Sequence, residues 1–429
     1  MEQKKVIVIG AGNRGQTYTN IMAEMPDKYK VVGVAEPIDN RRNYIMEKHG
    51  CEDKYCFTTW EHILDIPKFA DIAIISTMDQ LHFAPAMKAL ELGYDLLLEK
   101  PVAPTPEECG EIYKQAVKYG RKVMVCHVLR YTPFFMQLKD IIDSDTVGRV
   151  MSIEHTEAVG NIHQSHSFVR GNWGNSKRAT FMLLQKCCHD IDILQWLIGK
   201  DCSKLSSFGS LTYFTEENAP DGAPERCLEG CPIYDTCPYN SVKLYYDDKD
   251  NSWFRTTSTK KVAPTDEDVM EALKTTQYGK CVFRCDNDVV DHQVVNMEFA
   301  DKTTVNMTMN AFNRGGRYTH IMGTKGELWA DMRSDDGQQF RFYDFATKDF
   351  RYLDSEIAVG GDSITSGHGG GDHGIVVALY DYMTDVLKAE DVSEIGISCS
   401  NHMLVFAAED SRVRGTMIDT KAYMDKYMK

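Results

Sequence analysis

The amino-acid sequence predicts an α/β protein with two domains: a doubly wound parallel sheet over residues 1–128, then an α+β domain with a large, mostly antiparallel open sheet over residues 129–429. Two observations support this prediction. Short apolar strands alternate with helical patterns up to about residue 128, which is typical of a parallel sheet covered by helices. Beyond that point long strands follow one another with few helices between them, as in antiparallel sheets. A chain of 429 residues is long enough for both domains.

The elements of both domains follow from the spacing of apolar residues. In the first domain we expect strands at 6–9, 30–35, 70–76, 95–98 and 123–127, and helices at 16–25, 61–64, 83–92 and 106–119. In the second domain we expect strands at 150–158, 205–214, 293–299, 303–311, 318–323 and 327–331, and helices at 134–143, 188–197, 375–388 and 401–412. Residues 215–290 are polar and carry a cysteine cluster, which predicts an irregular insertion or extended loop.

The composition disfavours several classes of protein. Hydrophobic residues make up 43% and charged residues 26% of the chain, and no apolar run approaches the ~20 residues that span a bilayer. The net charge of −15 disfavours a large nucleic-acid footprint. The first residues lead straight into a strand without a signal-peptide pattern, so we expect a cytoplasmic protein. In that reducing compartment the 13 cysteines are expected to be free thiols, metal ligands or catalytic groups rather than disulfides.

A glycine-rich turn directly after the first strand predicts a dinucleotide-binding site. Gly10, Gly12 and Gly15 have the G-x-G-x-x-G spacing and stand between a strand and a helix. The first glycine allows a tight turn, the second lets the pyrophosphate approach backbone N–H groups, and the third lets the helix pack closely. Glu36 ends the second strand 21 residues after Gly15, where an acid accepts hydrogen bonds from the adenosine ribose.

Several segments, taken in order, resemble the Gfo/Idh/MocA family, the glucose–fructose oxidoreductase- and inositol dehydrogenase-like enzymes. These segments are residues 6–15, 74–82, 93–101, 189–196 and 411–418. The Glu-Lys-Pro sequence that ends the third segment is the most specific of the matches. The resemblance covers nearly the whole chain apart from the cysteine-bearing region.

The resemblance implies a Rossmann domain, a nicotinamide cofactor (NAD or NADP), and a carbohydrate or polyol substrate. It also implies a homo-oligomer, a dimer or tetramer, formed through the open C-terminal sheet, with the last helix, near 401–414, packing back on the Rossmann domain. Glu36 would repel a 2′-phosphate, which favours NAD, whereas Arg41 and Arg42 nearby could accommodate one. The residues expected to bind the cofactor are Gly10, Gly12, Asn13, Arg14, Gly15, Glu36, Ser76, Thr77, His82, Glu99 and Lys100.

Lys100 and His189 are the expected catalytic pair. Lys100 follows a strand at its carboxyl end, where an ammonium can bridge a substrate hydroxyl and stabilise an alkoxide. His189 can take and return a proton near neutral pH. The family usually has an aspartate four residues before this histidine, whereas this chain has Gln185, whose amide cannot accept a proton. Either Gln185 lines the substrate pocket, or the reaction differs from simple alcohol oxidation.

Five further residues are candidates for substrate contacts, and most have an alternative structural role. Arg130 and Tyr131 follow the last Rossmann strand and could meet a sugar or form an interdomain hinge. Trp173 could stack on a sugar face or pack in the core. Asp192 shares a helix face with the expected catalytic histidine. His368 lies in a glycine-rich segment before a helix and could contact substrate or serve the start of that helix.

Cys227, Cys231 and Cys237 resemble a metal knuckle, and the pair Cys281 and Cys285 could supply a fourth thiolate for a tetrahedral zinc ion. Free thiols and a disulfide are the alternatives. Any zinc here would be structural, because a nicotinamide cofactor carries the redox chemistry.

The sequence therefore predicts an enzyme of carbohydrate metabolism: an NAD-dependent oxidoreductase that transfers hydride between nicotinamide and a hydroxyl of a sugar, polyol or related compound. Two alternatives stand beside it. In the first, NAD stays bound while oxidation, elimination and reduction cleave a glycoside without net redox change. In the second, the chain is a non-catalytic, cofactor-binding sensor. No nucleic-acid or membrane partner is expected.

Overall fold

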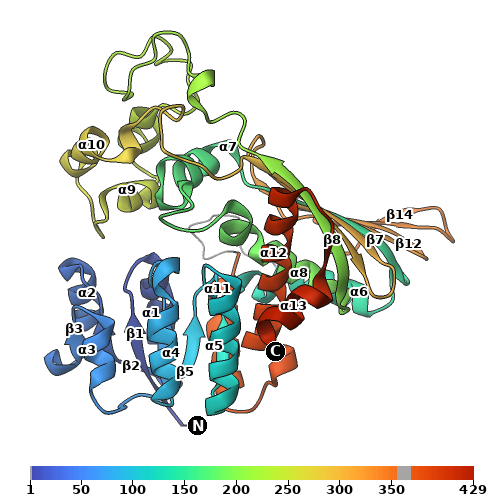
Figure 1. Cartoon of the computed structure of the whole chain (residues 1–429), viewed down its shortest axis with the longest axis horizontal. Coiled ribbons are helices and arrows are strands. Elements are labelled where there is room, and N and C mark those ends of the chain that lie inside the picture. The colour runs from blue at the N-terminus through green and yellow to red at the C-terminus, as the bar shows by residue number, and fades with distance from the viewer. Residues whose placement is uncertain (1, 336, 355–368) are drawn as a thin grey trace.

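The first of two sheets is parallel throughout and forms the centre of the N-terminal domain (Figure 1). The computed structural model describes residues 2–335, 337–354 and 369–429. Its first strands are β1 (Lys4–Ile9), β2 (Tyr29–Ala35), β3 (Cys56–Phe57), β4 (Ile72–Ile75), β5 (Asp95–Leu98) and β6 (Val123–Val125). Within the described residues they form a six-stranded sheet in the order β3-β2-β1-β4-β5-β6. The order reverses between β1 and β4, and ligands of doubly wound folds bind outside the carboxyl ends at such a point.

Helices cover both faces of this sheet, because side chains alternate along each strand between two apolar layers. The helices from the first domain are α1 (Asn13–Ala23), α2 (Asp39–His49), α3 (Trp60–Asp65), α4 (Phe83–Glu91) and α5 (Pro106–Tyr119). In β1, Ile7 and Ile9 belong to the layer with α3, α4 and α5, while Val6 and Val8 belong to the layer with α1 and α2. A late helix, α11 (Gly371–Met383), completes the second layer and packs against α1.

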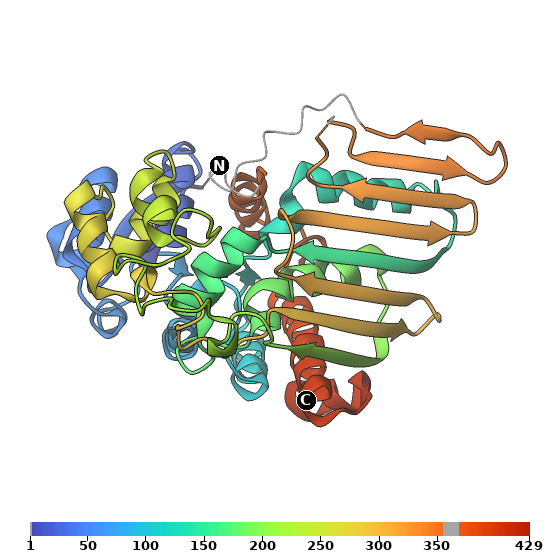
Figure 2. The same cartoon turned by 90° about the horizontal axis from the view of Figure 1, so that it is seen from above.

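The second sheet is large and mixed, and all of its neighbouring strands but one pair are antiparallel. Its strands are β7 (Val150–Ala158), β8 (Cys202–Ser210), β9 (His292–Phe299), β10 (Thr304–Asn310), β11 (Gly316–Gly323), β12 (Gly326–Asp331), β13 (Phe340–Asp344), β14 (Phe350–Tyr352) and β15 (Ile418–Asp419). In the described part of the chain these nine strands have the order β14-β13-β12-β11-β7-β10-β9-β8-β15, with β7 and β10 parallel. Burial alternates along β9 and β10, so one face is covered and the other is more exposed (Figure 2).

Three helices, α6 (Pro133–Asp143), α8 (Cys188–Ile198) and α12 (Ile395–Arg414), contribute to the core that covers this sheet. α12 also packs against α5, where Cys109 Sγ and Cys399 Sγ lie 3.2 Å apart. The two sheets confirm the predicted fold class. The boundary near residue 128 stays a prediction. The short strands β13 and β14, helix α2 and the terminal helix α13 (Thr420–Met428) were not expected.

The cysteine-bearing region, residues 215–290, is more ordered than the sequence predicts. It contains α9 (Ser252–Thr259) and α10 (Asp266–Thr275), which pack together around a small apolar cluster. The expectation of an irregular segment was therefore wrong in part, because aromatic residues spread through polar sequence supply this local core. In Figure 1 the region lies above the carboxyl ends of the first sheet. None of the helices in the described ranges is both long and apolar enough to cross a membrane.

Candidate active site at the carboxyl ends of the first sheet

In the glycine-rich turn, the first and third glycines have no room for a side chain, whereas the second has free space beside it. Gly10 has φ +89°, and a Cβ there would lie 2.6 Å from the Ser76 carbonyl oxygen. A Cβ on Gly15 would lie 2.2 Å from the Gly10 carbonyl oxygen. A Cβ on Gly12, in contrast, would lie 3.8 Å from its nearest neighbour, Arg41 Nη1. Since Gly12 is also the N-cap of α1, the turn fits the pyrophosphate of a dinucleotide.

Glu36 directly follows β2 and is only 4% exposed, and its carboxylate contacts the glycine-rich turn. The two oxygens accept hydrogen bonds from the backbone N–H groups of Ala11, at 2.7 Å, and Ile38, at 3.0 Å. An ionised carboxylate offers about four lone-pair sites, so ribose hydroxyls could still bind to it. The Arg41 guanidinium lies next to Gly12.

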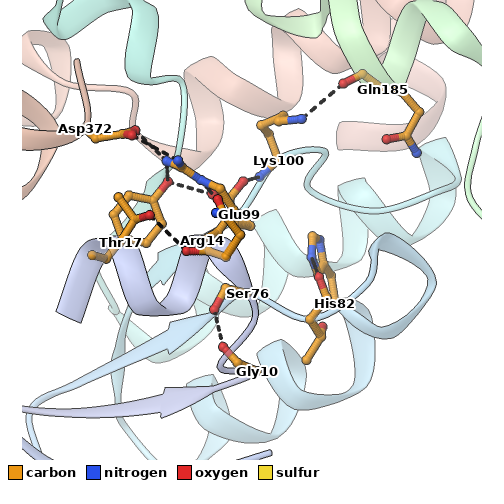
Figure 3. Close-up of polar contacts among 12 residues, drawn as sticks. Gly10, Arg14, Thr17, Ser76, His82, Glu99, Lys100, Gln185 and Asp372 are labelled. Carbon is orange, nitrogen blue, oxygen red and sulfur yellow. Dashed lines mark hydrogen bonds and ion pairs between the residues drawn. The ribbon is translucent and has the colours of Figure 1, made fainter. Parts of the chain in front are cut away.

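Arg14, in α1, connects this helix to the end of β5 and to α11 (Figure 3). Its guanidinium donates to Glu99 at 2.9 Å, to the Tyr18 hydroxyl at 2.6 Å and to Asp372 of α11 at 2.5 Å. Burial alone would raise the pKa of the Glu99 carboxyl, but Arg14 and Lys100 hold that pKa below its usual range. The second Glu99 oxygen accepts the backbone N–H of Lys100 at 3.0 Å. The side chains of Arg14 and Glu99 therefore fix the position of Lys100.

Ser76 and His82, in the segment after β4, contact the glycine-rich turn and the Lys100–Pro101 segment, respectively. The Ser76 hydroxyl donates to the carbonyl of the first glycine of the turn at 2.7 Å (Figure 3). The buried His82 ring lies between the carbonyl oxygens of Pro101, at 2.7 Å, and Thr77, at 3.2 Å. Asn13 is exposed on the first turn of α1. These predicted cofactor residues surround the same strand ends, and their contact with a nucleotide stays a prediction.

Lys100 and Gln185 meet between the two sheets. Lys100 Nζ donates to the Gln185 carbonyl oxygen at 3.1 Å (Figure 3). The Gln185 side chain is 3% exposed, and its amide donates to the Asp79 carboxylate and, at 2.8 Å, to the Thr180 hydroxyl. Asp79 was not among the residues predicted from the sequence. The signal that could have found it is an acid within four residues of the end of a central parallel strand.

His189 lies in the first turn of α8, among other buried imidazoles. Its ring meets that of His127 edge-on, with centroids 5.6 Å apart, and His127 meets His402 in the same way at 5.4 Å. Burial lowers the pKa of His127 below its usual range and the pKa of His402 to about 3. Both rings are therefore neutral at pH 7.

Arg130 and Asp192 form a buried, two-pronged ion pair. Arg130 Nε and Nη2 donate to the two carboxylate oxygens at 2.6 and 2.8 Å, and Asn401 of α12 donates to one of them at 2.5 Å. Burial alone would raise the pKa of Asp192, but the Arg130 guanidinium holds it below its usual range. The pair joins the exit of β6 to α8. The predicted contact of both residues with substrate stays a prediction.

A second ionic network fixes the opposite side of α8 to the second sheet. Asp190 accepts hydrogen bonds from His155, at 3.0 Å, and Arg317, at 2.7 Å. Arg317 also pairs with Glu157 at 2.7 Å, and Lys186 Nζ lies 3.4 Å from the same carboxylate. Burial would raise the pKa of Asp190, but Arg317 and His155 hold it below its usual range. Ion pairs of Asp192 and Asp190 therefore hold α8 on two sides, which fixes the backbone that carries His189.

The remaining predicted residues have other contacts or lie outside the described ranges. The Tyr131 hydroxyl is hydrogen-bonded to Ser393 at 2.9 Å, and the Trp173 ring lies 6.1 Å from that of Phe168. His368 falls outside the described residues. In the described ranges no three histidine, cysteine, aspartate or glutamate side chains are arranged to hold a metal ion, so the predicted zinc site at Cys227, Cys231 and Cys237 is not supported.

The fold and these strand-end residues define an NAD-binding oxidoreductase. The N-terminal domain described as "Oxidoreductase family, NAD-binding Rossmann fold" matches residues 4–127, and the family's C-terminal alpha/beta domain matches residues 139–345. The chain therefore belongs to the Gfo/Idh/MocA oxidoreductase family, as the sequence motifs predict.

Individual proteins show similarity at low identity. YteT of Bacillus subtilis is 22% identical over 387 residues, which cover 86% of each chain. Inositol 2-dehydrogenase of Salmonella typhimurium is 25% identical over 198 residues, which cover 46% of this chain and only 55% of that enzyme. The structure of scyllo-inositol dehydrogenase from Lactobacillus casei with NAD(H) and scyllo-inositol covers 98% of this chain and 100% of its own, at a TM-score of 0.66 and 14% identity.

Proposed function

We propose that this protein is an NAD-dependent dehydrogenase that transfers hydride between nicotinamide and a hydroxyl-bearing carbon of a sugar or polyol. The observation that carries the proposal is the contact of Lys100, at the carboxyl end of β5, with the segment that leads into the helix of His189. An ammonium and an imidazole-bearing helix thus meet at the sheet edge where dinucleotides bind. The similarity to enzymes named inositol dehydrogenases supports the substrate class.

Each group at this edge has a role in the proposed reaction. Bound NAD supplies the hydride chemistry, and the protein handles the proton and the developing charge. Lys100 donates to the substrate oxygen and stabilises it as the alkoxide forms. His189 takes the hydroxyl proton, as an imidazole can near neutral pH. Gln185 orients the substrate hydroxyl, and the Asp79 carboxylate holds its amide.

The proposal is tested first on the nucleotide that the purified protein retains. The protein is prepared without added cofactor and denatured, and NAD and NADP are measured in the supernatant. A protein that binds NAD reversibly and forms NADH with one member of a sugar and polyol panel supports the proposal. A protein that binds neither nucleotide when supplied contradicts the role assigned to the glycine-rich turn.

Redox-neutral cleavage of a glycoside is the second candidate, and the Gln185–Asp79 contact favours it. The helix carries an amide at this position, while a carboxylate approaches it from the first domain. That arrangement supplies a separate acid or base for the elimination step. This candidate requires NAD that is retained at one equivalent per chain and aglycone release without net NADH. If neither this nor a net redox reaction occurs, the protein is a cofactor-binding sensor.

Asp79→Asn should lower kcat about tenfold, because the charged hydrogen bond that fixes the Gln185 amide is weakened by about 1.5 kcal/mol. The substitution keeps the shape of the side chain, so stability and NAD affinity should change little. Steady-state kinetics and nucleotide titration check this, with the exposed Asp53→Asn as the matched control. An unchanged kcat would remove Asp79 from the proposed site.

Glu36→Gln should shift the nucleotide preference toward NADP by tenfold to a hundredfold. We propose NAD as the cofactor because two like charges about 5 Å apart repel by about 3 kcal/mol at an effective dielectric constant of ~20. Removing the carboxylate charge leaves Arg41 available to a 2′-phosphate. The ratio of the two dissociation constants is the measurement, and Glu36→Gln/Arg41→Ala should lose the gain. A preference that does not move would contradict the role of Glu36.

We further propose that the protein is a cytoplasmic homo-oligomer assembled through the more exposed face of the second sheet. Alternating buried and less buried residues on β9 and β10 support this face as the contact surface. Light scattering after size exclusion tests the assembly: Asn306→Arg on that face should yield monomers, and a mass unaffected by it would contradict the proposed surface.

A further inference from the structure

Two buried imidazoles contact the peptide groups that directly follow Lys100. The carbonyl oxygen of Pro101 lies 2.7 Å from His82 Nδ1. The backbone N–H of Val102 donates to His402 Nε2 at 3.1 Å. His82 lies directly before α4, whereas His402 lies in α12, 300 residues beyond Val102 along the chain. The segment that carries Lys100 is therefore held from both parts of the fold.

The two hydrogen-bond partners of the His402 ring fix which of its nitrogens carries the proton. Because a backbone N–H can only donate, His402 Nε2 offers its lone pair to Val102, and the ring proton is on Nδ1. Nδ1 donates this proton to the Ser398 carbonyl oxygen at 2.7 Å. The ring is fully buried, and burial lowers its pKa to about 3. It therefore stays neutral at pH 7 and keeps this tautomer.

The residue before His402 contacts the helix that carries the other half of the proposed catalytic pair. Asn401 is buried, and its Nδ2 donates to the Asp192 carboxylate at 2.5 Å. Asp192 lies in α8, three residues after His189, and α12 packs against α8. Two adjacent residues of α12 therefore contact the Lys100 segment and the His189 helix.

We propose that His402 is a positioning residue for Lys100, an inference that rests on the dehydrogenase function proposed above. Together with Asn401 it fixes how far Lys100 lies from the His189 helix. His402 acts through the N–H of Val102, two residues after Lys100. Without this acceptor the buried N–H would lack a partner, and the segment would move to find one. A displacement of about 1 Å at a reacting group can lower a rate about a hundredfold.

Two substitutions in the full-length protein separate the two hydrogen bonds of His402. The amide oxygen of His402→Gln reaches the position of Nε2 and accepts the Val102 N–H, whereas the shorter His402→Asn replaces Nδ1 alone. We expect His402→Asn to lower kcat by about tenfold or more at an unchanged dissociation constant for NAD. His402→Gln is the matched control and should keep kcat within about threefold of the parent enzyme. Equal losses in both variants, or a loss in neither, would overturn the proposal.

Hydrogen–deuterium exchange of the same proteins tests the contact without any substrate. Within residues 100–104 both prolines lack an N–H, so Val102 contributes one of only three exchanging amides. This amide should exchange about tenfold faster in His402→Asn than in the parent protein or in His402→Gln. Equal exchange in all three proteins would overturn the contact, and faster exchange without a loss of kcat would overturn the positioning role.

The exchange measurement also separates this inference from the proposed reaction. If the parent protein oxidises no sugar or polyol, the dehydrogenase proposal fails while the exchange rates still report the His402 contact. Circular dichroism and NAD titration show whether each variant folds. If His402→Asn does not fold, His402→Gln decides: values of kcat and Val102 exchange near those of the parent support the proposal, and a tenfold change in either overturns it.

Discussion

Lys100→Ala will lower kcat by about 10²–10³-fold with the substrate found in the polyol screen. The backbone of Lys100 is fixed by the Glu99 carboxylate, and its ammonium reaches the segment that precedes the His189 helix. Removing the ammonium leaves the developing alkoxide without its donor, which costs about 3–4 kcal/mol in the transition state. The Glu99 network remains, so the fold and the NAD site should persist.

The loss must appear in kcat with little change in the dissociation constant for NAD. Steady-state kinetics and a fluorescence titration with NADH separate the two. Lys88→Ala, on the exposed side of α4, removes a lysine that pairs only with Glu91 and should leave kcat unchanged. If Lys100→Ala kept kcat within about twofold of the parent enzyme, Lys100 would have no role in charge stabilisation.

Asp192→Ala will destabilise the protein by about 3–5 kcal/mol, because it leaves the buried Arg130 guanidinium without its carboxylate. The expected readout is a lower midpoint of urea unfolding at an unchanged slope. The double variant Arg130→Met/Asp192→Leu removes both charges and should recover most of the loss. As the control, Glu91→Ala breaks the partly exposed Lys88–Glu91 ion pair and should lower the free energy of unfolding by less than about 1 kcal/mol. Equal losses at both sites would contradict a buried ion pair.

The same carboxylate makes stability depend on pH. The pKa of Asp192 is lower in the folded protein than in the unfolded chain, where it lies near ~3.9. Its contribution is therefore fully present above the unfolded pKa and is lost as the pH falls through the lower, folded pKa. Below about pH 4 the parent protein should lose more stability than Asp192→Asn, and parallel acid profiles of the two proteins would contradict this.

Local patterns predicted the fold class, and they indicated the candidate site, because the residues that carry those patterns are neighbours in sequence. Gly10, Gly12 and Gly15 lie within one short stretch, and Lys100 follows its strand after a single residue, Glu99. The irregular character expected of residues 215–290 was wrong in part, since no periodic pattern reveals a core made of scattered aromatics. Strand β14 was missed because its three residues are all exposed.

The partners of the site residues lie beyond any local pattern. Asp79 contacts Gln185 across 106 residues, and Arg130 reaches Asp192 across 62. A sequence motif indicates that a charged side chain is important without showing what it faces. Arg130 and Asp192 were expected at the substrate from their positions alone; the structure adds that they pair with each other, and their contact with substrate stays a prediction.

The return of α11 to the first sheet has a consequence for synthesis of the chain. Ile375, Val376 and Leu379 belong to the apolar layer on one face of β1, and Asp372 pairs with Arg14 across 358 residues. A ribosome therefore completes all six strands of this sheet long before it supplies the helix that covers them. Until then one apolar face of the sheet lacks part of its cover, and the Rossmann domain cannot finish folding before about nine-tenths of the chain, through Met383, has emerged.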